Sequence, residues 1–106
     1  ISSLILNNSL ISLKRIEIGN DCFENATRFV IDGLNELETI IIGKNSFNNL
    51  LSRKGSGFSI MNCDQLNDIH IGRGSFCWYE SFECKNLPSL ISIQYRREIY
   101  SNSHSV

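Results

Sequence analysis

The sequence lacks the features that mark several large classes of protein. No apolar run approaches the roughly 18–20 residues that a membrane-spanning helix requires. The formal net charge is only −1, and the ten basic residues are scattered along the chain rather than gathered into a stripe with aromatic residues. This distribution argues against nucleic acid, and against an anionic membrane surface, as a partner.

The cysteines also lack the spacing of a zinc-binding motif. The four cysteines form no C-x-x-C pair, so they match no zinc signature. Cys63 and Cys84 occupy positions at which apolar residues otherwise recur, which favours buried free thiols over disulfides. Cys22 and Cys77 directly flank phenylalanines. We expect no metal, no cofactor and no catalytic activity, with one or more disulfides as the alternative to free thiols.

No targeting segment is visible, because Ile1 is neither a Met nor followed by a charged region and an apolar run. The compartment therefore stays open between the cell surface or exterior and the cytoplasm. Sequons begin at Asn7 and Asn25 and matter only in a secreted protein. The recurring pattern described next is entered and left midway, which predicts a piece of a longer array: one domain over residues 1–100 and a polar tail at 101–106.

The chain contains one sequence pattern three times. The pattern Leu-x-x-Ile-x-Ile-Gly-x-x-x-Phe begins at Leu13, Leu37 and Leu66, and a decayed copy begins at Leu90. Successive copies are spaced 24, 29 and 24 residues apart, within the range of solenoid repeats. The five additional residues of the second copy fall within 48–57 and predict a loop on one edge.

Each copy predicts two strands and a corner. The Ile-x-Ile alternation is typical of a half-buried strand, and the glycine after it predicts a positive φ at a sharp bend. The phenylalanine would fill the corner, and a second alternating pair, such as Phe29-x-Ile31, would form a strand on the opposite wall. We expect a mainly β solenoid of about four coils, with parallel strands on one wall, shorter strands opposite, and at most a single turn near 23–26 or 76–79.

These residues resemble the leucine-rich repeat superfamily, and in particular its BspA-like (Treponema-type) class. The two segments at 40–47 and 69–76 carry the likeness most clearly, which extends over roughly residues 10 to 95. The asparagine that usually follows the strand is replaced by glycine, so an asparagine ladder is not expected there. The resemblance implies a recognition scaffold for adhesion or protein–protein interaction, and it carries no catalytic residues.

The outward positions of the first strand are the candidate partner surface. They form two predicted columns: Arg15, Thr39, Asp68 and Ser92, and Glu17, Ile41, His70 and Gln94. Neighbours within a column would lie about 4.8 Å apart. The expected partner is a protein or a glycan, together with flanking repeats of the same chain. Arg53 and Lys54 in the inserted loop are further candidate contacts, against the alternative of a tolerated bulge.

Several readings stay open. Ile41 is either an anchor or an ordinary surface residue. His70 beside Asp68 suggests acid–base chemistry, but no nucleophile accompanies the pair. Trp78 and Tyr79 either pack over their corner or present a flat platform. A carbohydrate-active β-solenoid enzyme and a purely structural spacer are the alternatives to a recognition scaffold.

Overall fold

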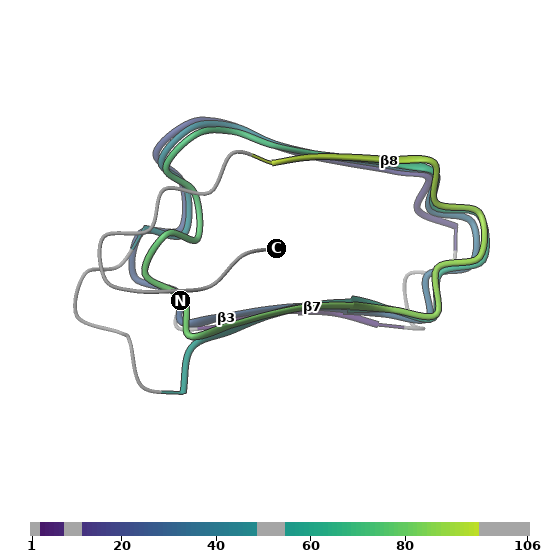
Figure 1. Cartoon of the computed structure of the whole chain (residues 1–106), viewed down its shortest axis with the longest axis horizontal. Coiled ribbons are helices and arrows are strands. Elements are labelled where there is room, and N and C mark those ends of the chain that lie inside the picture. Colours follow the sequence, from purple (N-terminus) through teal and green to yellow (C-terminus); the bar gives the residue numbers. More distant parts are fainter. Residues whose placement is uncertain (1–2, 8–11, 49–54, 96–106) are drawn as a thin grey trace.

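The chain folds into two parallel four-stranded sheets that it visits alternately. The computed structural model describes residues 3–7, 12–48 and 55–95, and within these residues there are eight strands and no helix. Sheet A contains β1 (Ser3–Leu6), β3 (Arg28–Asp32), β5 (Gly57–Met61) and β7 (Ser81–Lys85) in that order. Sheet B contains β2 (Arg15–Ile18), β4 (Thr39–Ile42), β6 (Asp68–Ile71) and β8 (Ser92–Tyr95). Successive circuits of the chain superpose when viewed as in Figure 1.

The predicted strands are confirmed, but their relative lengths were predicted wrongly. Strands β3, β5 and β7 of sheet A have five residues each, whereas all four strands of sheet B have four. The second wall is therefore not the shorter one. The flanking residues explain the error, since the polar ends of these strands, such as Arg28 and Lys85, pair in register although they lie outside the apolar alternation.

The core lies between the sheets and is built from aligned apolar residues. Phe23, Phe47 and Phe76 stack in one column, with ring centroids 5.1 and 4.7 Å apart. A second column joins β3, β5 and β7 through Phe29, Phe58 and Phe82, with centroids 5.3 and 4.0 Å apart. The inward isoleucines of sheet B face these rings, and those of β4 and β6 are almost fully buried. Large aligned side chains of this kind supply most of the hydrophobic stabilisation.

The segments that follow β2, β4 and β6 form what we call the phenylalanine corner, at 19–27, at 43–48 with 55–56, and at 72–80. The glycines that directly follow the strands, Gly19, Gly43 and Gly72, do not have the positive φ that we predicted. Left-handed backbone occurs instead two residues later, at Asp21, Asn45 and Gly74, and again at each phenylalanine, with φ between 54° and 83°.

Close stacking of circuits explains the glycines. A methyl group on Gly72 would lie 2.5 Å from the carbonyl carbon of Gly43, and one on Gly43 would lie 2.7 Å from that of Gly19. Such distances leave no room for a side chain. Gly19 belongs to the first circuit and has only Cys22 Sγ nearby, at 3.8 Å.

Buried serines connect the circuits at this corner. Ser46 Oγ donates to the carbonyl of Gly19 at 2.7 Å and accepts from the backbone N–H of Cys22 at 3.2 Å. Ser75 repeats the arrangement one circuit on, donating to Gly43 O at 2.7 Å and accepting from Ser46 N at 3.0 Å. The serines before Phe47 and Phe76 therefore serve as hydrogen-bonding rungs between circuits.

The segments that follow β3, β5 and β7 form a second corner, at 33–38, 62–67 and 86–91, which we call the asparagine corner. Its first residue is left-handed in each circuit: Gly33 (φ 76°), Asn62 (57°) and Asn86 (53°). The side chain of Asn86 donates to Asn62 at 2.8 Å, and that of Asn62 donates to Asp32 at 2.9 Å. A short asparagine ladder thus exists, but after the strands of sheet A rather than of sheet B.

Candidate functional site

The predicted partner surface is the outer face of sheet B, and its register is confirmed. Arg15, Thr39, Asp68 and Ser92 pair in turn across the four strands, and so do Glu17, Ile41, His70 and Gln94. All eight residues therefore share one face in two aligned columns. That this face binds a partner stays a prediction.

Exposure varies across this face. Arg15, Glu17 and Gln94 are exposed, whereas the five other residues of the two columns are half-buried. The Arg15 guanidinium and the Glu17 carboxylate form an exposed ion pair at 3.3 Å. Ile41 is shielded by its neighbours, so it offers a smaller apolar contact than a fully exposed isoleucine would.

Asp68 and His70 lie on adjacent outward positions of β6. Among the described residues, no hydrogen bond or ion pair involves either side chain. The structure therefore places the two groups on one face without joining them in an acid–base pair.

Tyr79 packs over the phenylalanine corner, which decides between the two readings of the Trp78–Tyr79 pair. Its side chain is 2% exposed, its ring meets Phe47 and Phe76 edge-on, and its hydroxyl donates to Ala26 O at 2.7 Å. Burial raises the pKa of its phenol. A flat platform made from both rings is thus wrong, because only Trp78 is partly accessible. A hydrogen-bonded turn occupies each place where we predicted one, with Ala26 N donating to Phe23 O and Tyr79 N to Phe76 O.

The inserted-loop candidates Arg53 and Lys54 lie outside the described residues, as does the polar tail.

The cysteines are free thiols. Cys63 and Cys77 are buried, and Cys22 and Cys84 are half-buried. Desolvation raises the pKa of Cys63, and desolvation followed by the negative charge of Glu83 raises the pKa of Cys84 to about 11. Both groups are therefore thiols rather than thiolates at neutral pH, which makes them poor nucleophiles. The described residues contain no group of three or more side chains able to hold a metal ion.

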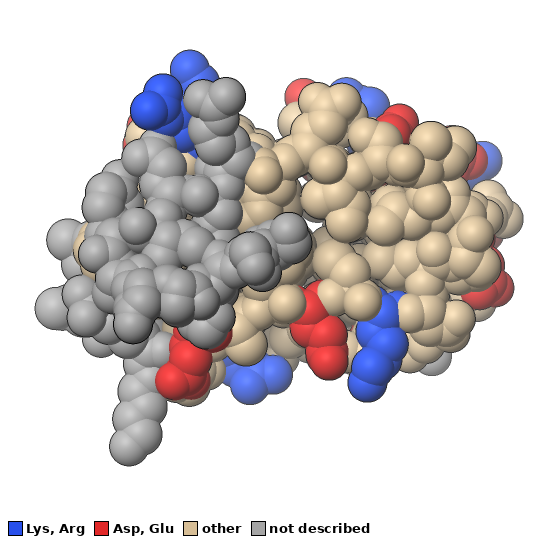
Figure 2. Space-filling model, viewed as in Figure 1, with Lys and Arg blue, Asp and Glu red and all other residues tan. Residues whose placement is uncertain are grey.

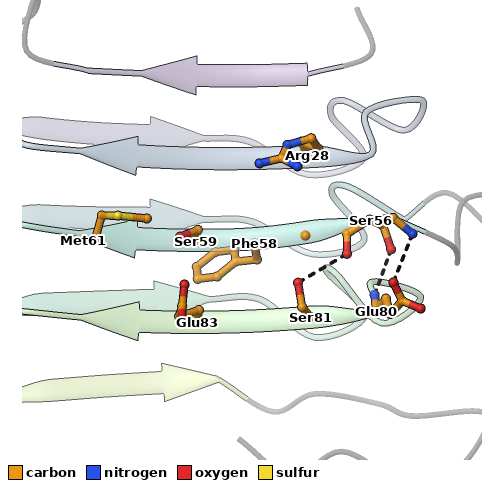
Figure 3. A pocket seen from close by; sticks show the side chains of 10 residues that line it. Arg28, Ser56, Phe58, Ser59, Met61, Glu80, Ser81 and Glu83 are labelled. Atoms are coloured by element: carbon orange, nitrogen blue, oxygen red, sulfur yellow. Dashed lines mark hydrogen bonds between the residues drawn. The ribbon is translucent and has the colours of Figure 1, made fainter.

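Sequence reasoning missed a pocket on the outer face of sheet A. It has a volume of about 410 Å³ and lies over β5, between Arg28 on β3 and Ser81 and Glu83 on β7 (Figure 3). Two of the three outward positions of β5, Gly57 and Ser59, carry little or no side chain, and the third is Met61. Gly57 was assigned to the inserted loop at 48–57, whereas it is the first residue of β5. A glycine within a strand signals a close approach or a gap, so this assignment concealed the pocket.

Charges of both signs surround the molecule in the view of Figure 2, where Lys and Arg alternate with Asp and Glu around the described part of the rim. No single-sign field develops there. This pattern offers no electrostatic attraction for a polyanion on the described part of that face.

Comparisons with protein-family models, with curated proteins and with solved structures found no match for this chain. The described segments contain no helix of the length and apolar character needed to cross a membrane.

Proposed function

We propose that the chain is a non-catalytic recognition module, built as a leucine-rich-repeat solenoid of the BspA-like type, that binds a protein through the outer face of sheet B. The observation that carries the proposal is the register, which places two columns of four chemically diverse side chains on one sheet. A sheet fixed by buried contacts on its inner side presents such residues in a constant arrangement, as binding surfaces of repeat proteins do.

The chemistry of the face favours a protein partner over a glycan. Ile41 lies in an inner strand of the sheet, with Glu17 and His70 as its neighbours in the column. An apolar centre surrounded by polar and charged groups is the usual composition of a protein–protein contact. None of the eight residues is a Trp, Tyr or Phe ring on which a sugar could stack.

The outer face of sheet B is smaller than a stable protein–protein interface. Four strands about 4.8 Å apart, each about 13 Å long, cover roughly 200 Å². A stable interface buries about 800 Å² on each partner. We therefore propose that the face binds weakly by itself and is enlarged by further circuits of the same kind.

A pair of matched variants tests the proposal. Ile41→Lys introduces a charge at the centre of the sheet B face, and Val30→Lys makes the same type of change on an inner strand of sheet A. The chain and both variants would be screened by surface display against a protein library and a glycan array. We expect protein binders whose affinity falls at least about tenfold with Ile41→Lys and is unchanged with Val30→Lys, as for a central contact residue.

Three outcomes would contradict the proposal. Binders that tolerate Ile41→Lys but not Val30→Lys would place recognition on sheet A. Cleavage of a polysaccharide that Asp68→Ala abolishes would identify an enzyme. Unchanged partner binding by a longer natural protein after deletion of these circuits would identify a spacer.

A further inference from the structure

The pocket over β5 arises because two consecutive outward positions of a central strand are nearly empty. Gly57 pairs with Arg28 on one side and Ser81 on the other, while Ser59 pairs with Val30 and Glu83. The pocket therefore has β5 as its floor, with Arg28 of β3 on one side and Ser81 and Glu83 of β7 on the other (Figure 3).

The pocket lining contains hydrogen-bond donors that have no acceptor or only a distant one. Among the described residues, none forms a hydrogen bond or ion pair with the Arg28 guanidinium. Ser59 Oγ is buried and has no hydrogen-bond partner. The Ser81 hydroxyl makes only a long bond of 3.4 Å to Ser56 O. An unmet buried hydroxyl costs free energy unless something binds to it. A guanidinium next to hydroxyls is the donor set that recognises a carboxylate.

The opposite side carries negative charge. Glu83 lies diagonally across the pocket from Arg28, two strands away and two residues further along, which separates the two backbone positions by about 12 Å. Its carboxylate forms a long ion pair with Lys85 Nζ at 3.9 Å. Glu80 lies at one end, where its carboxylate accepts from the N–H of Gly55 at 3.0 Å. Two carboxylates repel a doubly charged anion such as phosphate and attract an ammonium group. Cation and anions are thus held on opposite sides of one small space.

We propose that this pocket binds a small zwitterion of amino-acid or dipeptide size, with its carboxylate on Arg28 and Ser59 and its ammonium group on Glu83. The pocket volume of about 410 Å³ is at the lower end for small-molecule sites. The single aromatic residue in its lining, Phe58, is fully buried, so a sugar ring finds no platform. The site lies on sheet A and does not depend on the function proposed for sheet B.

Titration of the isotopically labelled full chain, followed by amide NMR shifts, tests the proposal. The probes are glycylglycine and a panel of free amino acids. Two blocked dipeptides serve as chemical controls: N-acetylglycylglycine, which lacks the ammonium group, and glycylglycinamide, which lacks the carboxylate. We expect a zwitterionic probe to shift the amides of Gly57, Ser59 and Ser81 in a saturable manner. Each blocked form should bind at least about tenfold more weakly, since each loses a charge-assisted contact.

Variants connect the binding to the named groups. Arg28→Gln should weaken binding at least about tenfold, whereas Arg15→Gln, the same change on sheet B, should leave it unaltered. Gly57→Val should abolish binding, because even a Cβ atom there would lie 3.0 Å from Ser81 Oγ. Ser59→Ala should weaken binding without lowering the melting temperature, because it removes a hydroxyl that has no partner in the free chain.

Specific outcomes would contradict the proposal. The proposal is wrong if no zwitterionic probe shifts these amides, or if either blocked dipeptide binds as well as the free one. Binding of inorganic phosphate or glucose in place of the zwitterions would overturn the assignment of ligand class. If Gly57→Val unfolds, Arg28→Gln still decides the matter, because the Arg28 side chain is exposed and makes no bond that folding requires.

Discussion

The phenylalanine corner and the asparagine corner both turn the chain from one sheet to the other, but they do so by different means. The phenylalanine corner is held by buried groups, with stacked rings and the serine rungs at Ser46 and Ser75. The asparagine corner also has buried side chains, such as Leu37 and Leu66, but its side-chain hydrogen bonds between circuits are exposed, as in the Asn86–Asn62 ladder and the bond from Ser89 Oγ to Asp64 O at 2.6 Å.

Access to water determines how much each set of hydrogen bonds contributes to the free energy of unfolding. A buried group that loses its partner has nothing to replace it, so its loss costs about 1–3 kcal/mol, whereas an exposed group bonds to water instead. The hydrogen-bonding residues of the phenylalanine corner should therefore tolerate substitution far less than those of the asparagine corner. It follows that the recurring Gly and Phe of the repeated pattern maintain the phenylalanine corner, whereas its Leu is buried at the asparagine corner.

The largest difference is expected at the glycines of the phenylalanine corner. A methyl group at Gly72 would lie 2.5 to 2.7 Å from backbone atoms of Gly43 and Lys44, which cannot move aside as a side chain can. We expect Gly72→Ala to lower the free energy of unfolding by about 3 kcal/mol, at the upper end of the range for overpacking. Urea unfolding followed by circular dichroism measures the loss.

Gly19→Ala is the matched control, because its nearest neighbour would be 3.8 Å away and its φ is not left-handed. It should change stability by less than about 0.5 kcal/mol. Equal losses for the two variants would show that backbone freedom, and not the contact between circuits, is what requires glycine.

A medium difference is expected at two serines that occupy different corners. Ser75→Ala leaves the Ser46 N–H and the Gly43 carbonyl without their partner, and should cost about 2 kcal/mol. Ser89→Ala removes one exposed bond and should cost less than about 0.5 kcal/mol. Thermal melting separates the two, since each kcal/mol corresponds to roughly 4–8 °C in a chain of this size. A comparable drop in both would remove the distinction between the corners.

The smallest effect is expected at Asn62. Its φ of 57° suits glycine, so Asn62→Gly removes the ladder and leaves the backbone unstrained. We expect a change within about 0.5 kcal/mol. Asn62→Val removes the ladder and also strains the left-handed backbone, so it should lower the free energy of unfolding by about 1–2 kcal/mol or more. If the glycine variant were as unstable as the valine variant, the exposed ladder would be a major source of stability.

The strands and their register could be predicted because apolar side chains must face the core. Ile40 and Ile42 are both buried, so the residues between and before them must face outward, and the 24-residue and 29-residue spacings align the copies. The conformation at Gly43 could not be predicted, since contact with the neighbouring circuit, rather than φ, excludes a side chain there.

The pocket on sheet A escaped prediction for a related reason. It depends on which residues stand beside Gly57 and Ser59 on β3 and β7, and that requires the register of sheet A across the inserted segment. Sequence reasoning concentrated on the wall with the stronger pattern. It therefore located the columns of sheet B correctly and overlooked the gap in sheet A.

The equal spacing of the strand pairs has a consequence for how the chain folds. Every strand pairing joins residues one circuit apart, so each closes a loop of 24 to 29 residues, and no sheet contact between the described strands requires the ends of the chain to meet. The entropic cost of closure rises only with the logarithm of loop length, so lengthening a circuit from 24 to 29 residues costs about 0.2 kcal/mol. Folding can thus proceed by adding one circuit to the previous one, and the length of residues 48–57 can vary with almost no penalty.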